Sequence, residues 1–401
     1  MKNKINFKTA IILIAVFCLG AICSNKTISL HSSPIEKGVE KRILFGSEVA
    51  WTSKRLTGSH YSLLTNSPSQ HHFNLLDSLI HSGKLEKIFS PEHGFATDQA
   101  DGVIISKTDN YKGIPVVSLY GKHLNPDSLD VAGIDTILID LQDVGLRFYT
   151  YISTVAKVLE SAGNYKIPVI ILDRPNPLNG EIVEGPVIED SLKSFVGYLP
   201  IPIRYGLTLG ELFQMAVSER WIAGSENISL SVIKMKNWSR SEYWNDLNLK
   251  WIPTSPNLPT FESVALYSGT CLFEGTNISE GRGTESPFEW IGSDFLSTDT
   301  LKTEFGLSAI SEARTPISIK GKAVNPKFEN VKINGYKLKI EDWKNFSSLK
   351  WTEQFIRKNK ANLKFRKHFY LLWGKADLLL SEKDLLQTDN FGKLRLKYFL
   401  Y

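Results

Sequence analysis

The sequence predicts an α/β fold in which helices cover both faces of a parallel β-sheet, followed by a second domain. From about residue 58, short continuous apolar segments alternate with amphipathic ones, the pattern of a parallel sheet buried between helices. The 401 residues exceed the roughly 100–200 residues of a usual domain. Three prolines cluster just after residue 251, where the composition changes, which indicates either a domain boundary or a structured crossover. We expect a first domain at 41–250 and a second at 251–401.

Residues 1–23 have the features of an export signal. Lys2, Lys4 and Lys8 form a basic start, and residues 9–22 form an apolar run that is short for a membrane span. Cys23 closes this run and could carry a lipid, although Ile22 stands where lipoprotein signals need a small residue. We predict an exported protein, periplasmic or associated with the outer membrane, whose one membrane contact would be this lipid anchor. Residues 24–40 would form a polar tether.

Composition and charge exclude several classes of protein. With 42% hydrophobic and 22% charged residues, the chain can build a sizeable core and is not predicted to be disordered. The net charge of +5 is spread along the chain without a basic block, so nucleic acid is not an expected partner. Cys18 lies in the leader, and after Cys23 only Cys271 remains, which leaves no intramolecular disulfide.

The predicted elements of the first domain alternate in type. Thr208 and Glu211 form a capping box that opens a helix, and His71 and His72 open an earlier helix, where we expect them to face solvent. The second domain includes a strand at 335–340 and a helix at 351–357. In the first domain, strands are expected at 59–66, 85–89, 114–119, 135–141, 167–172 and 230–235, and helices at 71–80, 151–162 and 208–223.

Polar side chains follow several of these strands, at the sheet edge where ligands bind in this class of fold. Because the carboxyl ends of parallel strands meet at one edge, these side chains are predicted to share a cleft. They are Asn66, Glu92, His93, Asp143, Arg147, Tyr149, Tyr151, Asp173 and Arg174.

This set of residues favours cleavage of a glycosidic bond over other chemistries. No GxGxxG follows a strand and no GxxxxGK[ST] occurs, so no nucleotide cofactor is expected. The chain has neither an HExxH motif for a metal nor a GxSxG turn for acyl transfer. Carboxylates, arginines, tyrosines and a histidine remain, which suits a mechanism with two carboxyl groups.

Glu92 is the best candidate for a general acid. Pro91 and Gly94 predict a tight turn that aims its side chain into the cleft, and Phe95 would shield the carboxyl group from water. The alternative is that Glu92 and His93 cap the next helix.

The other residues at the strand ends also have two interpretations. Arg147 and Arg174 could bind an anionic group of a substrate, and Tyr149 and Tyr151 could stack on a sugar face. Alternatively, the tyrosines pack beneath the following helix. The separate alternative for each arginine is an ion pair with Asp143 or Asp173.

Residues 271–289, CLFEGTNISEGRGTESPFE, are rich in acids and glycines yet follow an apolar run. Paired Glu and Arg side chains give directional hydrogen bonds to a sugar, and glycines allow a close backbone approach. The stretch is therefore either a sugar-binding loop or a charged surface loop with an internal Glu–Arg pair.

Several longer motifs make the chain resemble the exo-β-N-acetylmuramidase family, also catalogued as DUF1343 and placed in glycoside hydrolase family 171. The matches run in order from about residue 55 to the C-terminus. They are SPEHGF (90–95), DLQDVGLRFYTYIST (140–154), LDRPNPLNG (172–180), EGP (184–186), PIRYGLTLGEL (202–212), SPNLPT (255–260) and GTCLFEGTNISEGRGTESPFEWIG (269–292). The match is loose at 95–102 and weakest at 310–334.

The resemblance implies a fold and an activity. The expected fold is a Rossmann-like domain joined to a smaller α+β domain, with the active site between them. The expected activity is release of N-acetylmuramic acid from the non-reducing ends of peptidoglycan fragments, without a nucleotide or metal. The alternative is a non-catalytic lipoprotein that binds muropeptides or sugars in the same cleft.

The resemblance also suggests roles for individual residues. Glu92 matches the proposed catalytic carboxylate, with His93 beside it, and Glu280, Asp143 and Glu184 are candidates for its partner. Arg147, Arg174 or Arg282 would bind the lactyl carboxylate of muramic acid. The family's other polar motifs include the predicted substrate-binding residues Asp143, Arg147, Tyr151, Asp173, Arg174, Glu184, Asn277 and Arg282.

Overall fold

The computed structural model describes residues 42–94, 109–299 and 301–401. The predicted leader, tether and lipidation site lie outside these residues, and so does Phe95, the predicted shield of Glu92. Among the described residues, no helix is both long enough and apolar enough to span a bilayer.

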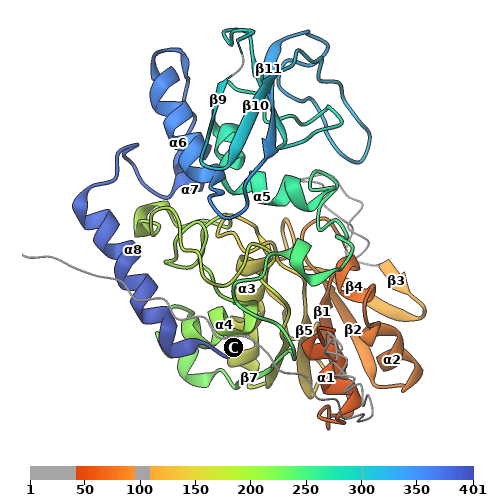
Figure 1. Ribbon diagram of the computed structural model, residues 1–401. Coiled ribbons are helices and arrows are strands. Elements are labelled where there is room, and N and C mark those ends of the chain that lie inside the picture. The colour runs from red at the N-terminus through yellow and green to blue at the C-terminus, as the bar shows by residue number, and fades with distance from the viewer. Residues whose placement is uncertain (1–41, 95–108, 300) are drawn as a thin grey trace, which may run out of the picture. The chain divides into compact units, whose positions relative to one another are not determined.

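The first sheet has seven strands, in the order β3-β4-β2-β1-β5-β6-β7 (Figure 1). All neighbouring pairs are parallel except β3 and β4. The order reverses beside β1, which pairs with both β2 and β5, so the sheet is doubly wound and the predicted α/β fold is confirmed. The strands are β1 (Tyr61–Thr65), β2 (Leu85–Ser90), β3 (Asp109–Tyr111), β4 (Ile114–Ser118), β5 (Thr136–Asp140), β6 (Val169–Leu172) and β7 (Leu230–Ile233).

Neighbouring residues of a strand belong to two different cores, because side chains alternate between the faces of a sheet. Leu63 and Leu138 pack with helices α1 (Gly46–Thr52) and α2 (Leu75–His81). Leu64 and Ile139 pack with helices α3 (Tyr151–Tyr165) and α4 (Leu209–Ser218). Both faces are thus covered, which explains why the strands read as continuous apolar runs.

The predicted capping box is present at the start of α4. The Thr208 hydroxyl accepts from the Glu211 backbone N–H, and the Glu211 carboxylate accepts from the Thr208 backbone N–H. The helix ends at Ser218 rather than near residue 223, because Arg220 adopts a left-handed backbone conformation with φ of 56°.

The expectation that both His71 and His72 face solvent is wrong for His72. Its ring lies between the rings of Phe45 and Trp244, with centroid separations of 5.4 and 6.2 Å. Burial and the nearby Arg174 guanidinium lower the pKa of His72. His71 is exposed, as predicted.

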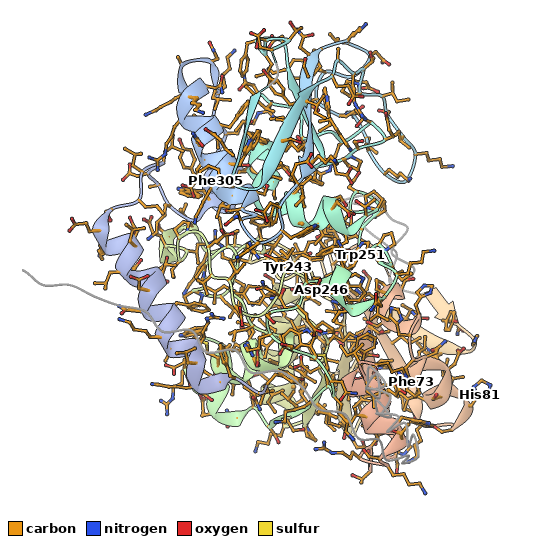
Figure 2. All side chains as sticks on the ribbon, viewed as in Figure 1. Phe73, His81, Tyr243, Asp246, Trp251 and Phe305 are labelled. Carbon is orange, nitrogen blue, oxygen red and sulfur yellow. The ribbon has the colours of Figure 1, made fainter. Side chains whose placement is uncertain are left out.

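Aromatic side chains pack along the segment after β7, where Figure 2 labels Tyr243, Asp246 and Trp251. Asp246 accepts a hydrogen bond from the Tyr243 backbone, and the Tyr243 ring packs on Trp343. The Trp251 ring contacts Trp244 at 5.2 Å between centroids. Aromatic contacts therefore pack the segment that leads into the three prolines.

A second sheet has four antiparallel strands in the order β8-β11-β10-β9. The predicted strand at 335–340 and helix at 351–357 lie within β11 and α6. The strands are β8 (Trp290–Ser293), β9 (Leu301–Glu304), β10 (Leu307–Ser311) and β11 (Asn334–Ile340), and the helices are α5 (Phe261–Thr270), α6 (Ser348–Asn359), α7 (Lys367–Trp373) and α8 (Glu382–Leu394).

The C-terminal residues return to the first sheet. The Tyr401 hydroxyl donates to the Asp173 carboxylate at 2.8 Å, and the Leu400 backbone N–H donates to Glu211 at 2.8 Å. Arg395 donates to the backbone carbonyls of Gly180 and Glu181. The last residues of the chain therefore stabilise the region beside α4.

Candidate active site

A pocket of about 420 Å³ lies at the carboxyl ends of β2, β4 and β5. Both the parallel-sheet region and later segments of the chain line it, so neither part forms it by itself. The polar and aromatic lining includes Glu92, His93, Tyr120, Tyr149, Thr150, Ser255, Tyr267, Glu274, Arg282, Phe288 and His368.

Glu92 and His93 occupy the tight turn that the sequence predicted. The Gly94 N–H donates to the Pro91 carbonyl at 3.2 Å, and both His93 and Gly94 have positive φ, of 70° and 77°. A non-glycine residue in this region is uncommon, and such residues often cluster at functional sites. The Thr150 hydroxyl donates to Glu92 Oε2 at 2.7 Å, which orients the carboxyl group at the pocket wall.

Of the two predicted tyrosines, Tyr149 lines the pocket and Tyr151 does not. Tyr149 lines the pocket, and its ring meets the rings of Tyr151 and Tyr267 edge-on, with centroids 4.7 and 6.4 Å away. Tyr151 packs behind it and donates its hydroxyl to the Thr254 carbonyl at 2.9 Å. Tyr149 and Tyr267 thus form an aromatic wall, and Tyr151 supports it.

Arg282 is held at the pocket by two carboxylates and a ring. Its Nη1 lies 3.0 Å from Glu274 Oε1 and 3.4 Å from Glu280 Oε1. The guanidinium carbon lies 4.9 Å from the centroid of the Phe288 ring. Glu274 also lies 3.6 Å from Nε2 of His368. The Glu–Arg pair expected in the 271–289 stretch therefore exists, and it faces a pocket.

Glu280 stands behind Arg282 and does not line the pocket. Its Oε2 accepts from Lys327 Nζ at 2.9 Å. Burial would raise the pKa of Glu280, but Lys327 and Arg282 together hold it below its usual value. Glu280 is therefore placed to position Arg282.

The glycines of this stretch allow the protein backbone to approach itself. A Cβ on Gly275 would lie 2.2 Å from the Phe369 backbone nitrogen, and one on Gly281 would lie 2.6 Å from the Ser286 carbonyl oxygen. Neither glycine lines the pocket. Their small size serves the folding of the loop and its packing on α7.

Arg147 is fully enclosed by the protein. Its Nη1 donates to the carbonyls of Pro186 and Ile201, and its Nη2 donates to those of Leu372 and Trp373. Burial lowers the pKa of Arg147 to about 9. The guanidinium forms no ion pair with Asp143 and does not line the pocket.

Arg174 and Asp173 also bond within the protein. Arg174 pairs with Asp140, from Nε to Oδ1 at 2.6 Å, rather than with Asp173. Asp173 accepts from the Thr208 hydroxyl at 2.7 Å and from the Gly210 N–H at 2.8 Å, and burial raises its pKa. Neither residue is part of the pocket lining.

The remaining predicted residues stabilise loops outside the pocket. Asp143 accepts from the Tyr205 hydroxyl at 2.6 Å, and burial raises its pKa to about 6. Glu184 pairs with Arg204 at 2.8 Å. Asn277 bridges the backbones of Asn362 and Lys364. Of the predicted site residues, the structure brings Glu92, His93, Tyr149 and Arg282 together at the pocket.

Several residues of the pocket lining were not predicted as site residues from the sequence. Glu274 is one of the acids of the 271–289 stretch, but the sequence pattern does not indicate that Glu274 rather than Glu280 lines the pocket. Thr150 lies within the family motif at 140–154, between Tyr149 and Tyr151. His368 belongs to no motif, and only the packing of α7 brings it to the pocket.

One cluster outside the pocket has the composition of a cation site. Among the described residues, ligand atoms of His123, Asp127 and Asp130 lie within 4.8 Å of one another. His123 Nε2 contacts Asp130 Oδ2 at 2.5 Å, and both aspartates accept backbone N–H groups of their own turn. These bonds account for the cluster as a loop-stabilising turn.

Comparison with known proteins places the chain among peptidoglycan hydrolases. Residues 61–262 match the model of the N-terminal part of the exo-β-N-acetylmuramidase NamZ family, and residues 265–401 match that of its C-terminal part. Peptidoglycan β-N-acetylmuramidase NamZ of Bacillus subtilis is 38% identical over 351 residues, which are 85% of this chain and 78% of that protein.

Two crystal structures of DUF1343 family proteins from Bacteroides fragilis have a similar fold. One is 28% identical with a TM-score of 0.77, and the other is 32% identical with a TM-score of 0.74. Each alignment covers 90% of this chain and 99% of the solved chain.

The contacts of Arg147 and Arg282 predict losses of stability that differ in size. Replacing Arg147 with Met leaves four buried carbonyls without their donor, so we expect a loss of about 3 kcal/mol or more in the free energy of unfolding. Arg282→Met should cost about 1 kcal/mol, because its partners retain other donors or reach solvent. Urea unfolding measures both. A fully stable Arg147→Met protein would contradict the structural role.

Proposed function

The chain belongs to the exo-β-N-acetylmuramidase NamZ family, and we propose that it releases N-acetylmuramic acid from the non-reducing ends of peptidoglycan fragments. The observation that supports this most directly is a single pocket that brings Glu92, from the end of β2, together with Glu274 and Arg282 from the 271–289 stretch. Glycoside hydrolysis needs two carboxyl groups around the scissile bond.

We assign Glu92 as the general acid. A proton from its carboxyl group would pass to the glycosidic oxygen as the bond to the muramic acid ring breaks. Thr150 holds the carboxyl orientation through its bond to Oε2. The left-handed turn at His93 and Gly94 limits the motion of the backbone that presents Glu92.

We assign Glu274 as the second carboxylate. Among the described residues, Glu92 and Glu274 are the acids that line this pocket, whereas Asp143, Glu184 and Glu280 bond elsewhere. Arg282 and His368 hold Glu274 from two sides. In this position a carboxylate can activate water or stabilise the positive charge that develops on the sugar ring.

Selectivity for muramic acid is assigned to Arg282. The lactyl carboxylate distinguishes this sugar from N-acetylglucosamine, and a guanidinium can bind it with two parallel hydrogen bonds. Arg147 and Arg174 are enclosed by protein partners, whereas the Arg282 side chain is 20% exposed and lines the pocket. The aromatic wall of Tyr149 and Tyr267 would contact the sugar ring.

We further propose that residues 1–23 direct export to the periplasm or outer membrane. The basic start, the apolar run and Cys23 support this proposal. If Cys23 is lipidated, the full-length protein expressed in a Gram-negative host should incorporate a palmitate analogue, and Cys23→Ser should abolish the label. Equal labelling of both proteins would exclude an anchor at Cys23, and retention of the unprocessed chain in the cytoplasm would exclude export.

Replacing Glu92 with Gln tests the catalytic assignment. The amide keeps the size of the side chain but cannot supply the proton, so turnover of a chromogenic N-acetylmuramic acid glycoside should fall by about 10²–10⁴-fold. Ligand affinity should stay within about threefold, because the binding contacts remain. Thr150→Val removes the hydrogen bond that orients the Glu92 carboxyl group, so it should lower kcat by less than Glu92→Gln does. Near-normal turnover in Glu92→Gln would reject the assignment.

Replacing Arg282 with Met tests the selectivity. We expect the ratio of affinities for N-acetylmuramic acid over N-acetylglucosamine to fall by about tenfold or more, because the lactyl carboxylate loses a charge-assisted pair. Isothermal titration in the Glu92→Gln background separates binding from turnover. Arg357→Met, on the exposed surface of α6, is the matched control. An unchanged ratio of affinities would show that a group other than Arg282 recognises the lactyl carboxylate.

A further inference from the structure

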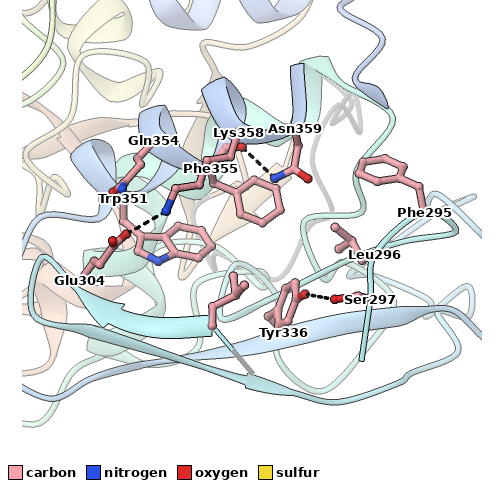
Figure 3. Close-up of a pocket in the computed structure, with 11 residues that line it drawn as sticks. Phe295, Leu296, Ser297, Glu304, Tyr336, Trp351, Gln354, Phe355, Lys358 and Asn359 are labelled. Carbon is pink, nitrogen blue, oxygen red and sulfur yellow. Dashed lines mark hydrogen bonds and ion pairs between the residues drawn. The ribbon is translucent and has the colours of Figure 1, made fainter. Parts of the chain in front are cut away.

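A second pocket, of about 490 Å³, lies between α6 and the four-stranded sheet. It shares no lining residue with the candidate active site. Figure 3 shows its lining, with Trp351, Gln354 and Phe355 projecting from α6 and Tyr336 from β11. Its volume falls in the range of about 300–1,000 Å³ that is usual for small-molecule sites.

The floor of this pocket is built from packed aromatic rings. The rings of Trp351 and Phe355 stack with centroids 5.2 Å apart and planes at 22°. Tyr336 meets Phe355 edge-on at 6.5 Å, and the half-buried Phe295 ring forms part of the side wall. Such a floor favours the apolar part of a ligand and orients it through ring contacts.

One buried polar atom in the lining lacks a partner. Gln354 Oε1 is buried and accepts no hydrogen bond from any described residue. Buried side-chain oxygens nearly always have a donor, because leaving one without a bond is costly. Gln354 lines the pocket, so a rotation of its amide group would turn this buried acceptor toward a ligand N–H beside the apolar floor.

The rim of the pocket offers groups for a neutral, hydroxyl-rich ligand. Glu304 and Lys358 lie 3.4 Å apart across the mouth, so their charges compensate and do not favour an anion. The Ser297 and Tyr336 hydroxyls lie 3.3 Å apart on the other side of the pocket in Figure 3. These groups can donate to and accept from sugar hydroxyls.

We infer that this pocket is a second saccharide site that takes an N-acetylated amino sugar. The acetamido methyl would pack on the aromatic floor, its N–H would donate to Gln354 Oε1, and the ring hydroxyls would meet the rim. N-acetylglucosamine satisfies each requirement and is neutral. The choice of a sugar as the source of the acetamido group rests on the proposed function, since peptidoglycan contains this sugar. A site of this kind would hold a glycan without cleaving it.

The affinity for di-N-acetylchitobiose, measured by isothermal titration, tests the inference. This disaccharide carries no muramic acid. Gln354→Leu keeps the approximate size of the side chain but removes the acceptor, so affinity should fall about tenfold. Lys350→Ala, at an exposed position of the same helix, and Arg282→Met, in the other pocket, should bind normally.

Two further measurements separate a ligand contact from a structural role. Gln354→Leu should keep or raise Tm, because the oxygen without a partner is removed. It should also retain normal turnover of a small chromogenic muramic acid glycoside. Ser297→Trp, which places an indole at the exposed rim, should also weaken chitobiose binding and remains informative if Gln354→Leu folds poorly.

Three results would overturn the inference. They are unchanged chitobiose affinity in Gln354→Leu and Ser297→Trp, loss of affinity only in Arg282→Met, and tighter binding of N-acetyl-alanine methylamide than of the sugar. The last result would indicate a peptide ligand. The two proposals can fail separately. If the protein shows no muramidase turnover but its chitobiose binding depends on Gln354, the proposed function is rejected and the second saccharide site is retained.

Discussion

The buried guanidinium of Arg147 joins the parts of the chain that form the active-site pocket. It bonds to carbonyls from the segments at 186 and 201 and from the end of α7. Phe148, Tyr149 and Thr150 follow it directly in the sequence, and His368 and Leu372 belong to α7. One side chain therefore fixes the spacing between two walls of the pocket. Its charge is stabilised by four carbonyl dipoles rather than by a carboxylate.

A series of contacting side chains of alternating charge supports the pocket wall that contains Arg282. Lys327 contacts Glu280, Glu280 contacts Arg282, and Arg282 contacts Glu274, which is followed by His368. Only the last three line the pocket, so Lys327 and Glu280 act by holding Arg282 in place. Such support limits the rotation of a long side chain and lowers the entropy lost when it binds a substrate.

The strands and helices were largely predictable, whereas the roles of the polar residues were not. Apolar runs such as 135–141 and the Thr208–Glu211 capping box depend on neighbours in sequence, and the structure has both. Arg147 and Arg174 come at strand ends just as Glu92 does, yet both turn into the protein and bond to groups distant in sequence. A strand end predicts proximity to the cleft. It does not predict the direction of a side chain, which depends on partners from other segments.

The sequence by itself determined the alternating α/β pattern, the turn that presents Glu92, the family and the stretch that contains Arg282. These features depend on local spacing or on long motifs, which a single chain displays directly. Only the tertiary structure decided that Glu274 rather than Glu280 lines the pocket, and that His368 joins it. It also decided that Tyr151 stands behind Tyr149. These outcomes depend on how α7, the loop at 271–289 and the segment at Thr254 pack on the edge of the parallel sheet. Contacts between residues so far apart in sequence produce no periodic pattern in the sequence.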